Sequence, residues 1–236
     1  MRPRSALPVQ SPRRMRTLAV LPIKSFGAAK SRLADVLGTA ARRTLAEAMF
    51  RDTLSSLSQV PGLDAVAVVS AGDMAAEAAA AGERVTLLRD EREAGHNPAA
   101  EIGVRHALRT GCERLLLVPG DTPVLDPGEV SGLLEAFAAG GPGLIVIPDR
   151  HGTGTNGLLL APPDALPPSF GPDSLRRHVE QAKLAGLRHS VERLPSLALD
   201  VDTPEDLAEL WALLEARPGL APLTRAELGR GSTAAA

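Results

Sequence analysis

Aspartates stand at two places in the chain where a buried strand is expected to end. Asp121 lies in Val118-Pro119-Gly120-Asp121-Thr122-Pro123, and Asp200 and Asp202 lie in Leu199-Asp200-Val201-Asp202-Thr203-Pro204. Mg²⁺ prefers one or two carboxylates, with water and phosphate oxygens completing its octahedron. The two segments therefore predict a Mg²⁺ site formed by Asp121, Asp200 and Asp202.

Each of these aspartates also has a structural alternative. Asp121 taken alone is equally typical of a turn cap before Pro123. Asp202 precedes Thr203-Pro204-Glu205-Asp206, a strong helix start. Residues two apart on a strand point the same way, so Asp200 and Asp202 could both face one crevice. We expect Asp200 to be the metal ligand, and Asp202 to be a helix cap or a supporting group beside the metal.

A basic loop follows the first expected strand. It runs from Lys24 to Arg32 and holds Lys24 and Lys30, two of the three lysines in the chain, with small residues between them. Small residues let backbone amides approach a polyphosphate, which Lys and Arg neutralise. A solvated basic loop is the alternative, and the Gly-Lys-Ser/Thr of a P-loop is missing. We favour a phosphate site formed by Lys24, Lys30 and Arg32.

Two later loops have the composition of anion sites. Residues 149–157 are rich in glycine and threonine, and Phe170-Gly171-Pro172-Asp173-Ser174 ends at a helix start, where free N–H groups favour a phosphate or carboxylate. A tight hairpin turn and a simple N-cap are the alternatives. The five histidines show no metal-ligand spacing. Covalent catalysis is not indicated, because the chain has no Gly-x-Ser-x-Gly elbow and Cys112 has no obvious activating partner.

The bulk composition excludes several classes of protein. A length of 236 residues with 44% hydrophobic content fits one α/β domain, and a net charge of −2 gives no field to attract nucleic acid or acidic membranes. One cysteine excludes an intrachain disulfide, and no apolar run approaches the roughly 20 residues of a membrane span. Residues 1–14 lack the apolar core of a signal peptide, so we expect them to be a disordered extension, or the true start to be Met15. We therefore expect the protein to be cytoplasmic.

Strands and helices are expected to alternate along most of the chain. Strands are predicted at Thr17–Ile23, Ala65–Ser70, Val85–Leu88, Arg114–Pro119, Leu144–Pro148, Gly157–Pro162 and Leu197–Val201, and helices at Thr39–Gln59, Asp73–Ala81, Asn97–Thr110, Asp126–Ala139, Pro172–Ala185 and Thr203–Ala216. This order predicts a three-layer αβα domain over residues 15–216 with a mostly parallel sheet and an antiparallel excursion at residues 144–162. Residues 217–236 are expected to be a flexible tail. Ligands should bind beyond the carboxyl ends of the strands.

Taken together, the motifs resemble one known family. They are Lys24…Lys30-Ser31-Arg32-Leu33, Pro119–Pro123, Arg150-His151-Gly152-Thr153-Gly154-Thr155-Asn156, Phe170–Ser174 and Leu199–Pro204, in this order. The set is similar to the phosphoenolpyruvate / 2-phospho-L-lactate guanylyltransferases of coenzyme F420 biosynthesis, over roughly residues 15–214. The Gly-Asp and Asp-Thr-Pro pieces are shared with many nucleotidyltransferases, whereas the segments around Thr155 and Gly171 are more specific.

The resemblance implies a fold, a reaction and a set of site residues. The fold would be of the glycosyltransferase-A type, like the molybdenum-cofactor guanylyltransferases, and the acid's phosphate would attack the α-phosphorus of GTP and release pyrophosphate. Asp121 and Asp200 would bind Mg²⁺, with Asp121, Lys24 and Lys30 as the catalytic residues. Thr155, Gly171 and Ser174 would hold the acid. Lys24, Lys30 and Arg32 would cover the triphosphate, and Asn97 is a candidate for the guanosine site.

Several alternatives stay open at this point. The acid is expected to be phosphoenolpyruvate, with 2-phospho-L-lactate as the alternative, since the two share a phosphate and a carboxylate. Another nucleotidyltransferase of the same fold is a further reading, although the glycine-rich first loop of the molybdenum-cofactor enzymes is missing, and a non-catalytic nucleotide sensor is a third. The resemblance allows a homodimer and implies that the product passes to a deazaflavin-dependent transferase.

Overall fold

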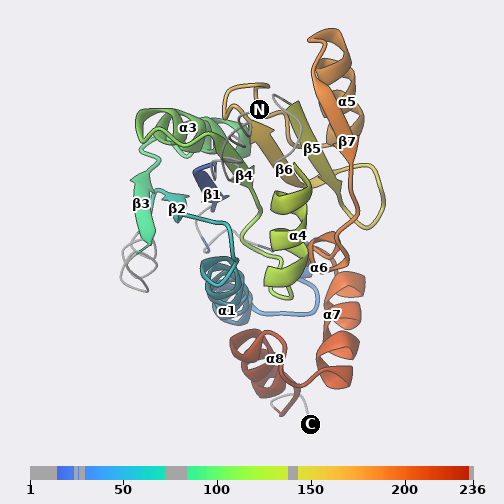
Figure 1. Cartoon of the computed structure of the whole chain (residues 1–236). Helices are drawn as coiled ribbons and strands as arrows, with labels where there is room; N and C mark the ends of the chain where they lie inside the picture. The colour runs from blue at the N-terminus through green and yellow to red at the C-terminus, as the bar shows by residue number, and fades with distance from the viewer. Residues whose placement is uncertain (1–14, 24–25, 27–29, 73–83, 138–142, 234–236) are drawn as a thin grey trace, which may run out of the picture.

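A twisted seven-stranded sheet forms the centre of the molecule. The computed structural model describes residues 15–23, 26, 30–72, 84–137 and 143–233. The strands are β1 (Thr17–Pro22), β2 (Ala65–Ser70), β3 (Val85–Arg89), β4 (Arg114–Leu117), β5 (Gly143–Pro148), β6 (Thr155–Ala161) and β7 (Arg188–Val191), in the spatial order β3-β2-β1-β4-β6-β5-β7. Only β6 runs antiparallel to its neighbours, β4 and β5 (Figure 1). The predicted antiparallel excursion is therefore confirmed.

The apolar strands are buried on both faces, which is typical of a sheet covered by helices. In β1, Leu18 and Val20 face one core cluster and Ala19 and Leu21 face the other, because alternate side chains point to opposite faces. The register of β1 against its two parallel neighbours places the carboxyl ends of β1, β2 and β4 at one edge of the sheet. The amino end of the antiparallel β6 lies at that same edge.

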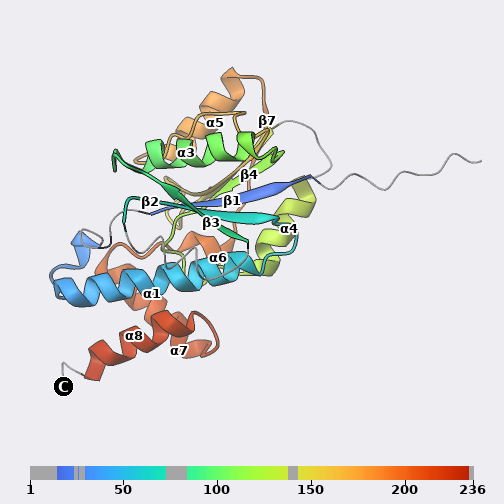
Figure 2. The ribbon, with the colours of Figure 1, turned by 90° about the vertical axis from the view of Figure 1, so that its left-hand side faces the viewer.

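Helices cover both faces of the sheet, as Figure 2 shows. On one face lie α3 (His96–Arg109) and α5 (Ser174–Leu184), and on the other lie α1 (Thr39–Ser58), α4 (Pro127–Phe137) and the short α6 (Pro195–Ala198). The α3 helix approaches β1 closely at Gly103, where an added Cβ would lie 2.5 Å from Val20 Cγ1. The predicted three-layer αβα architecture is confirmed.

A further layer of helices lies outside α1. It contains α7 (Pro204–Ala216) and α8 (Pro222–Thr233), which pack with α1 around a third core cluster that includes Leu45 and Leu210 (Figure 2). The Asp52 carboxylate of α1 anchors α8 by accepting hydrogen bonds from the backbone N–H and the hydroxyl of Thr224, at 2.8 and 2.7 Å. The expectation of a flexible tail over residues 217–236 is therefore wrong for α8, whose first turn is held by a buried carboxylate.

Two other predicted elements need correction. No strand forms over residues 197–201; the short helix α6 ends there at Ala198, and the carbonyl groups of its last two residues accept hydrogen bonds from the Arg150 N–H and the Asn156 side chain. The polar strand β7 was not predicted and forms the sheet edge beside β5. The α3 helix begins at His96 with Gly95 as its N-cap, one residue earlier than the predicted Asn97. The helix predicted at Asp73–Ala81 lies outside the described residues.

No helix in the described ranges is both long and apolar enough to cross a lipid bilayer.

Candidate active site

A polar cavity opens at the sheet edge where β1, β2 and β4 end. Its volume is about 660 Å³, and its wall combines the end of β1, the 3-10 turn η2 (Ser31–Leu33), the loop after β4, the start of β6 and the connection between α6 and α7. Predicted site residues from six separate segments line it: Lys30, Arg32, Asn97, Asp121, Thr155, Gly171, Asp200 and Asp202. The sheet topology therefore gathers the residues that the sequence pattern indicated. Lys24 lies outside the described residues.

Lys30 links two of the three aspartates. Its ammonium group forms ion pairs with Asp121 and, at 3.0 Å, with Asp202, while its side chain is only 6% exposed. Burial by itself would lower the pKa of Lys30, but the carboxylates of Asp121 and Asp202 outweigh burial and leave that pKa raised. The group therefore stays positively charged at neutral pH. Lys30 has a left-handed backbone with φ of 57° and is the N-cap of η2.

Asp200 is held from behind by Asn156, the second residue of β6. The Asn156 amide nitrogen donates to Asp200 Oδ1 at 3.0 Å and to Leu197 O at 3.0 Å. Burial raises the pKa of Asp200, the hydrogen bond from Asn156 opposes that rise, and the negative charges of Asp121 and Asp202 add to it. Three carboxylates thus share a small volume with one buried ammonium group.

The donor set fits Mg²⁺. Asp121 Oδ1 is buried and has no hydrogen-bond partner, so one carboxylate oxygen facing the cluster is unsatisfied. Within the described residues, no group of three His, Cys, Asp or Glu side chains has the geometry of a metal cage. Mg²⁺ does not need such a cage, because it is usually bound by one or two carboxylates together with substrate phosphates. Asp202 forms an ion pair with Lys30, and the N-cap of α7 is Thr203, so the expectation of Asp202 as the helix cap is wrong.

The part of the cavity wall formed by Thr155 and Gly171 carries residues expected to hold a small acid. Thr155 and Gly171 line the cavity, and Gly171 has φ of 118°, a conformation that favours glycine. Ser174 is buried behind them as the first residue of α5, and its N–H donates to Gly171 O at 3.1 Å. The structure therefore brings all three predicted residues together, with Ser174 in the supporting place.

The loop before Thr155 is held by hydrogen bonds between its own residues. The Asp149 carboxylate accepts the N–H groups of Thr153 and Gly154, each at 3.0 Å. Arg150 pairs with Asp206 at 2.7 Å and also with Glu209. Residues 149–154 therefore form the tight hairpin that was the alternative to an anion site.

Asn97 lines the cavity, but both ends of its amide are occupied. Oδ1 accepts the Phe170 N–H at 2.7 Å and Nδ2 donates to the Phe170 carbonyl at 3.1 Å. These contacts indicate that Asn97 holds the Phe170 loop, rather than making the predicted contact with guanosine. Asn156 and His178 are functional candidates that the sequence reading missed, although Asn156 directly follows Thr155 in a motif that drew attention.

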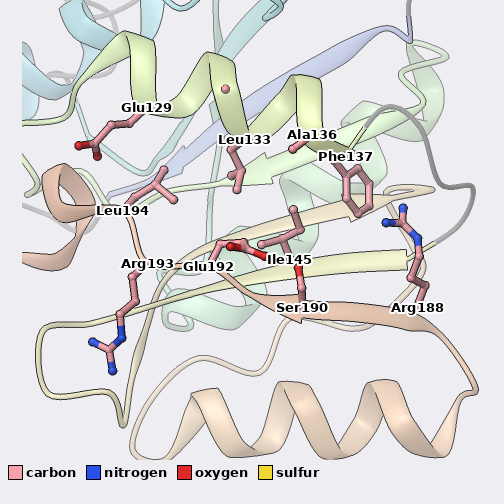
Figure 3. A pocket seen from close by; sticks show the side chains of 11 residues that line it. Glu129, Leu133, Ala136, Phe137, Ile145, Arg188, Ser190, Glu192, Arg193 and Leu194 are labelled. Atoms are coloured by element: carbon pink, nitrogen blue, oxygen red, sulfur yellow. The ribbon is translucent and has the colours of Figure 1, made fainter.

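A second cleft lies away from this site, between α4 and β7 (Figure 3). None of its lining residues is a predicted site residue. Arg188 lies over the Phe137 ring at 4.7 Å, and the Glu129 carboxylate accepts the Ser196 N–H at 3.1 Å. These contacts join α4 to the segments around β7, which indicates a structural role for the charged groups.

The fold is that of the nucleotidyltransferases. A putative nucleotide-diphospho-sugar transferase from Desulfovibrio desulfuricans shares the fold, with a TM-score of 0.74 at 17% sequence identity over 92% of this chain and 95% of that chain.

Sequence comparison narrows the class to one family. The family model "Guanylyl transferase CofC like" matches residues 17–215. A relative from Conexibacter woesei named phosphoenolpyruvate guanylyltransferase is 46% identical, over 92% of this chain and 96% of its own length. A relative from Colwellia psychrerythraea named 3-phospho-D-glycerate guanylyltransferase is 36% identical, over 85% and 93%. The chain belongs to the CofC-like guanylyl transferase family.

Proposed function

We propose that this protein is a Mg²⁺-dependent guanylyltransferase that joins phosphoenolpyruvate to GTP and releases pyrophosphate. The observation that carries the proposal is one cavity that brings two sets of residues together. The Lys30–Asp121–Asp202 cluster and Asp200 line it, and so do Thr155 and Gly171. The names of several relatives, one of them 46% identical, support phosphoenolpyruvate as the acid.

The reaction requires one phosphorus centre to exchange one oxygen for another. A phosphate oxygen of the acid attacks the α-phosphorus of GTP, a new P–O bond forms, and the bond to the bridging oxygen breaks so that pyrophosphate leaves. The attacking phosphate is already ionised at neutral pH, so no general base is needed. Such transfers depend on in-line positioning and charge neutralisation.

The described residues can supply both requirements. Lys30 and Arg32 place positive charge beside the site of the triphosphate, and Lys30 keeps its proton because two carboxylates face it. Asp121 and Asp200 would hold Mg²⁺, which when bound would neutralise and orient phosphate oxygens. Thr155 and Gly171 would position the acid in the same cavity. In this proposal the product serves coenzyme F420 biosynthesis in the cytoplasm, where a deazaflavin-dependent transferase consumes it.

A second acid has support from one relative. The Colwellia psychrerythraea protein is named for 3-phospho-D-glycerate, which shares a phosphate and a carboxylate with phosphoenolpyruvate. 2-Phospho-L-lactate shares the same two groups. The direct test incubates the full chain with Mg²⁺ and GTP and with each acid in turn, measures pyrophosphate, and identifies the product by mass. Absence of pyrophosphate with all three acids would overturn the proposal.

Replacing Asp121 tests the proposed metal site. Asp121→Asn keeps the size of the side chain but removes its charge and weakens its pairing with Lys30, so we expect turnover to fall by at least about 100-fold, the scale of losing one group that stabilises charge in a transition state. The matched control is Asp164→Asn, a charge removal at an exposed residue. Near-normal turnover in a folded Asp121→Asn protein would remove Asp121 from the site.

A further inference from the structure

The backbone between Ser169 and Ser174 is held in place by side chains from two helices. The segment precedes α5 and belongs to no strand, yet it supplies Gly171 to the acid wall of the cavity. Arg177 donates to Ser169 Oγ at 3.0 Å and to Ser169 O at 2.9 Å, and also to Pro172 O. The conformation of this acid-wall loop, residues 169–174, therefore depends on side chains outside it.

Asn97 fixes the middle of the loop from α3. Its amide binds both the N–H and the carbonyl of Phe170, at 2.7 and 3.1 Å, as a neighbouring strand would. The Phe170 ring lies between two histidines in edge-to-face geometry, with His96 at 4.7 Å and His178 at 5.4 Å between ring centroids. Phe170 is thus fixed at its backbone and at its ring, and Gly171 follows directly.

His178 fixes the start of the loop from α5, and its contacts define its tautomer. The backbone N–H of Ser169 points at Nε2 at 3.0 Å, and an N–H can only donate, so Nε2 carries no proton. Burial, reinforced by the positive charge of Arg177, lowers the pKa of His178 to about 4, so the ring is neutral near pH 7. Its one proton must then be on Nδ1.

The proton on Nδ1 determines how Thr155 can act. Nδ1 lies 3.1 Å from Thr155 Oγ1, which must therefore accept this hydrogen bond. In the described part of the chain, Thr155 Oγ1 forms no second hydrogen bond, so its own proton is free to be donated. Thr155 lines the cavity, where an anionic oxygen of a substrate would be the acceptor.

We propose that His178 and Asn97 are positioning residues for the acid substrate. His178 accepts from Ser169 and donates to Thr155, and so directs the Thr155 hydroxyl proton toward an anionic group of the acid, while Asn97 sets the backbone that presents Gly171. The inference rests on the proposed function, because it assigns the acid to this wall. It predicts that both residues affect binding of the acid more than binding of GTP.

Three substitutions of His178 separate its two hydrogen bonds. His178→Leu removes both, His178→Asn keeps an amide donor near the position of Nδ1, and His178→Gln keeps a carbonyl acceptor near the position of Nε2. We expect His178→Leu to raise the KM for phosphoenolpyruvate about tenfold, which corresponds to one lost hydrogen bond, with the KM for GTP changed less than twofold. His178→Asn and His178→Gln should each restore part of the affinity. His106→Asn, on the outer side of α3, is the matched control.

A double-mutant cycle tests the link between His178 and Thr155. Thr155→Val removes the hydroxyl and keeps the shape, so replacing His178 with Gln in that background should change the dissociation constant of phosphoenolpyruvate, measured by calorimetry with Mg²⁺, by less than in the wild type. Of the His178 substitutions, the cycle uses only His178→Gln, together with Thr155→Val and the double variant. Additive effects would overturn the proposal, as would equal rises in both KM values or an unchanged KM for the acid in a folded His178→Leu protein.

The failure of this inference can be distinguished from the failure of the proposed function. Wild-type protein that releases no pyrophosphate with any of the three acids contradicts the proposed function. If the wild type turns over phosphoenolpyruvate but the His178 and Asn97→Ala variants bind the acid normally, only the positioning roles are contradicted.

Discussion

The imidazole of His178 is fully buried, and this makes the stability of the fold depend on pH. Burial, followed by the charge of Arg177, lowers its pKa to about 4 in the folded chain, whereas an unfolded histidine has a pKa of about 6.5. Between these values the unfolded chain binds a proton that the folded chain does not. Stability from this residue is therefore present above about pH 6.5 and is lost as the pH falls toward 4.

A comparison of two proteins isolates this contribution. Between pH 7 and pH 4.5, the free energy of unfolding of the wild type should fall by about 2 kcal/mol more than that of His178→Gln, because glutamine does not titrate. Urea titrations at both pH values, followed by circular dichroism, measure the difference. Parallel losses in the two proteins would show that His178 is not neutral and buried as described.

At the level of single residues, the sequence reveals charged groups at strand ends more readily than the groups that hold them. Asp121, Asp200 and Lys30 are conspicuous because charge beside apolar strands, or lysine in a lysine-poor chain, needs an explanation. Asn156 and His178 are ordinary polar residues by composition. Their partners lie 44 and 23 residues away in the sequence, at Asp200 and Thr155, so their roles depend on the tertiary fold.

Among the elements, the connection between α6 and α7 shows why a strand was predicted where none forms. Leu197, Leu199 and Val201 alternate with polar or small residues, a pattern typical of a strand. All three are buried, but their backbone pairs with the β5–β6 hairpin: Arg150 N–H donates to Ala198 O at 2.9 Å. The alternation of apolar residues predicts correctly which side chains are buried, but it does not specify the hydrogen-bonding partner of the backbone.

Replacing Asn156 tests how the connection between α6 and α7 positions Asp200. Asn156→Asp has nearly the same size but loses the donors to Leu197 O and Asp200 and adds a carboxylate beside Asp200. We expect the free energy of unfolding to fall by about 1–3 kcal/mol, since buried acceptors lose their partners, and turnover to fall at least about tenfold.

Thermal denaturation and pyrophosphate release measure the two effects of Asn156→Asp. Asn156→Ala serves as the comparison, because it removes the donors without adding a charge and should retain more activity at equal stability. The same activity in the two variants would show that the added charge has no effect on the site.

On the scale of the whole molecule, the chain adds a helical layer outside the αβα core. Of its two helices, α7 was predicted, but α8 was missed because residues 217–236 are rich in proline, glycine and alanine, which is typical of a frayed end. The anchoring contact lies elsewhere, at Asp52 in α1, and gives no local signal near α8. The three-layer αβα class was predicted correctly because the hydrophobic patterns of β1, β2, β4, β5 and β6 and of the helices that cover them lie within those elements.

Asp52 should therefore control the docking of α8. Its carboxylate is buried and accepts hydrogen bonds from the Thr224 N–H, the Thr224 hydroxyl and the Leu223 N–H, the last at 3.3 Å. Asp52→Ala leaves these donors at the start of a helix without an acceptor, so we expect the free energy of unfolding to fall by about 1–3 kcal/mol. Trypsin should also cleave sooner at Arg225, which lies in α8. Asp35→Ala, at an exposed site, is the control, and equal stability and equal cleavage in the two variants would show that α8 does not depend on Asp52.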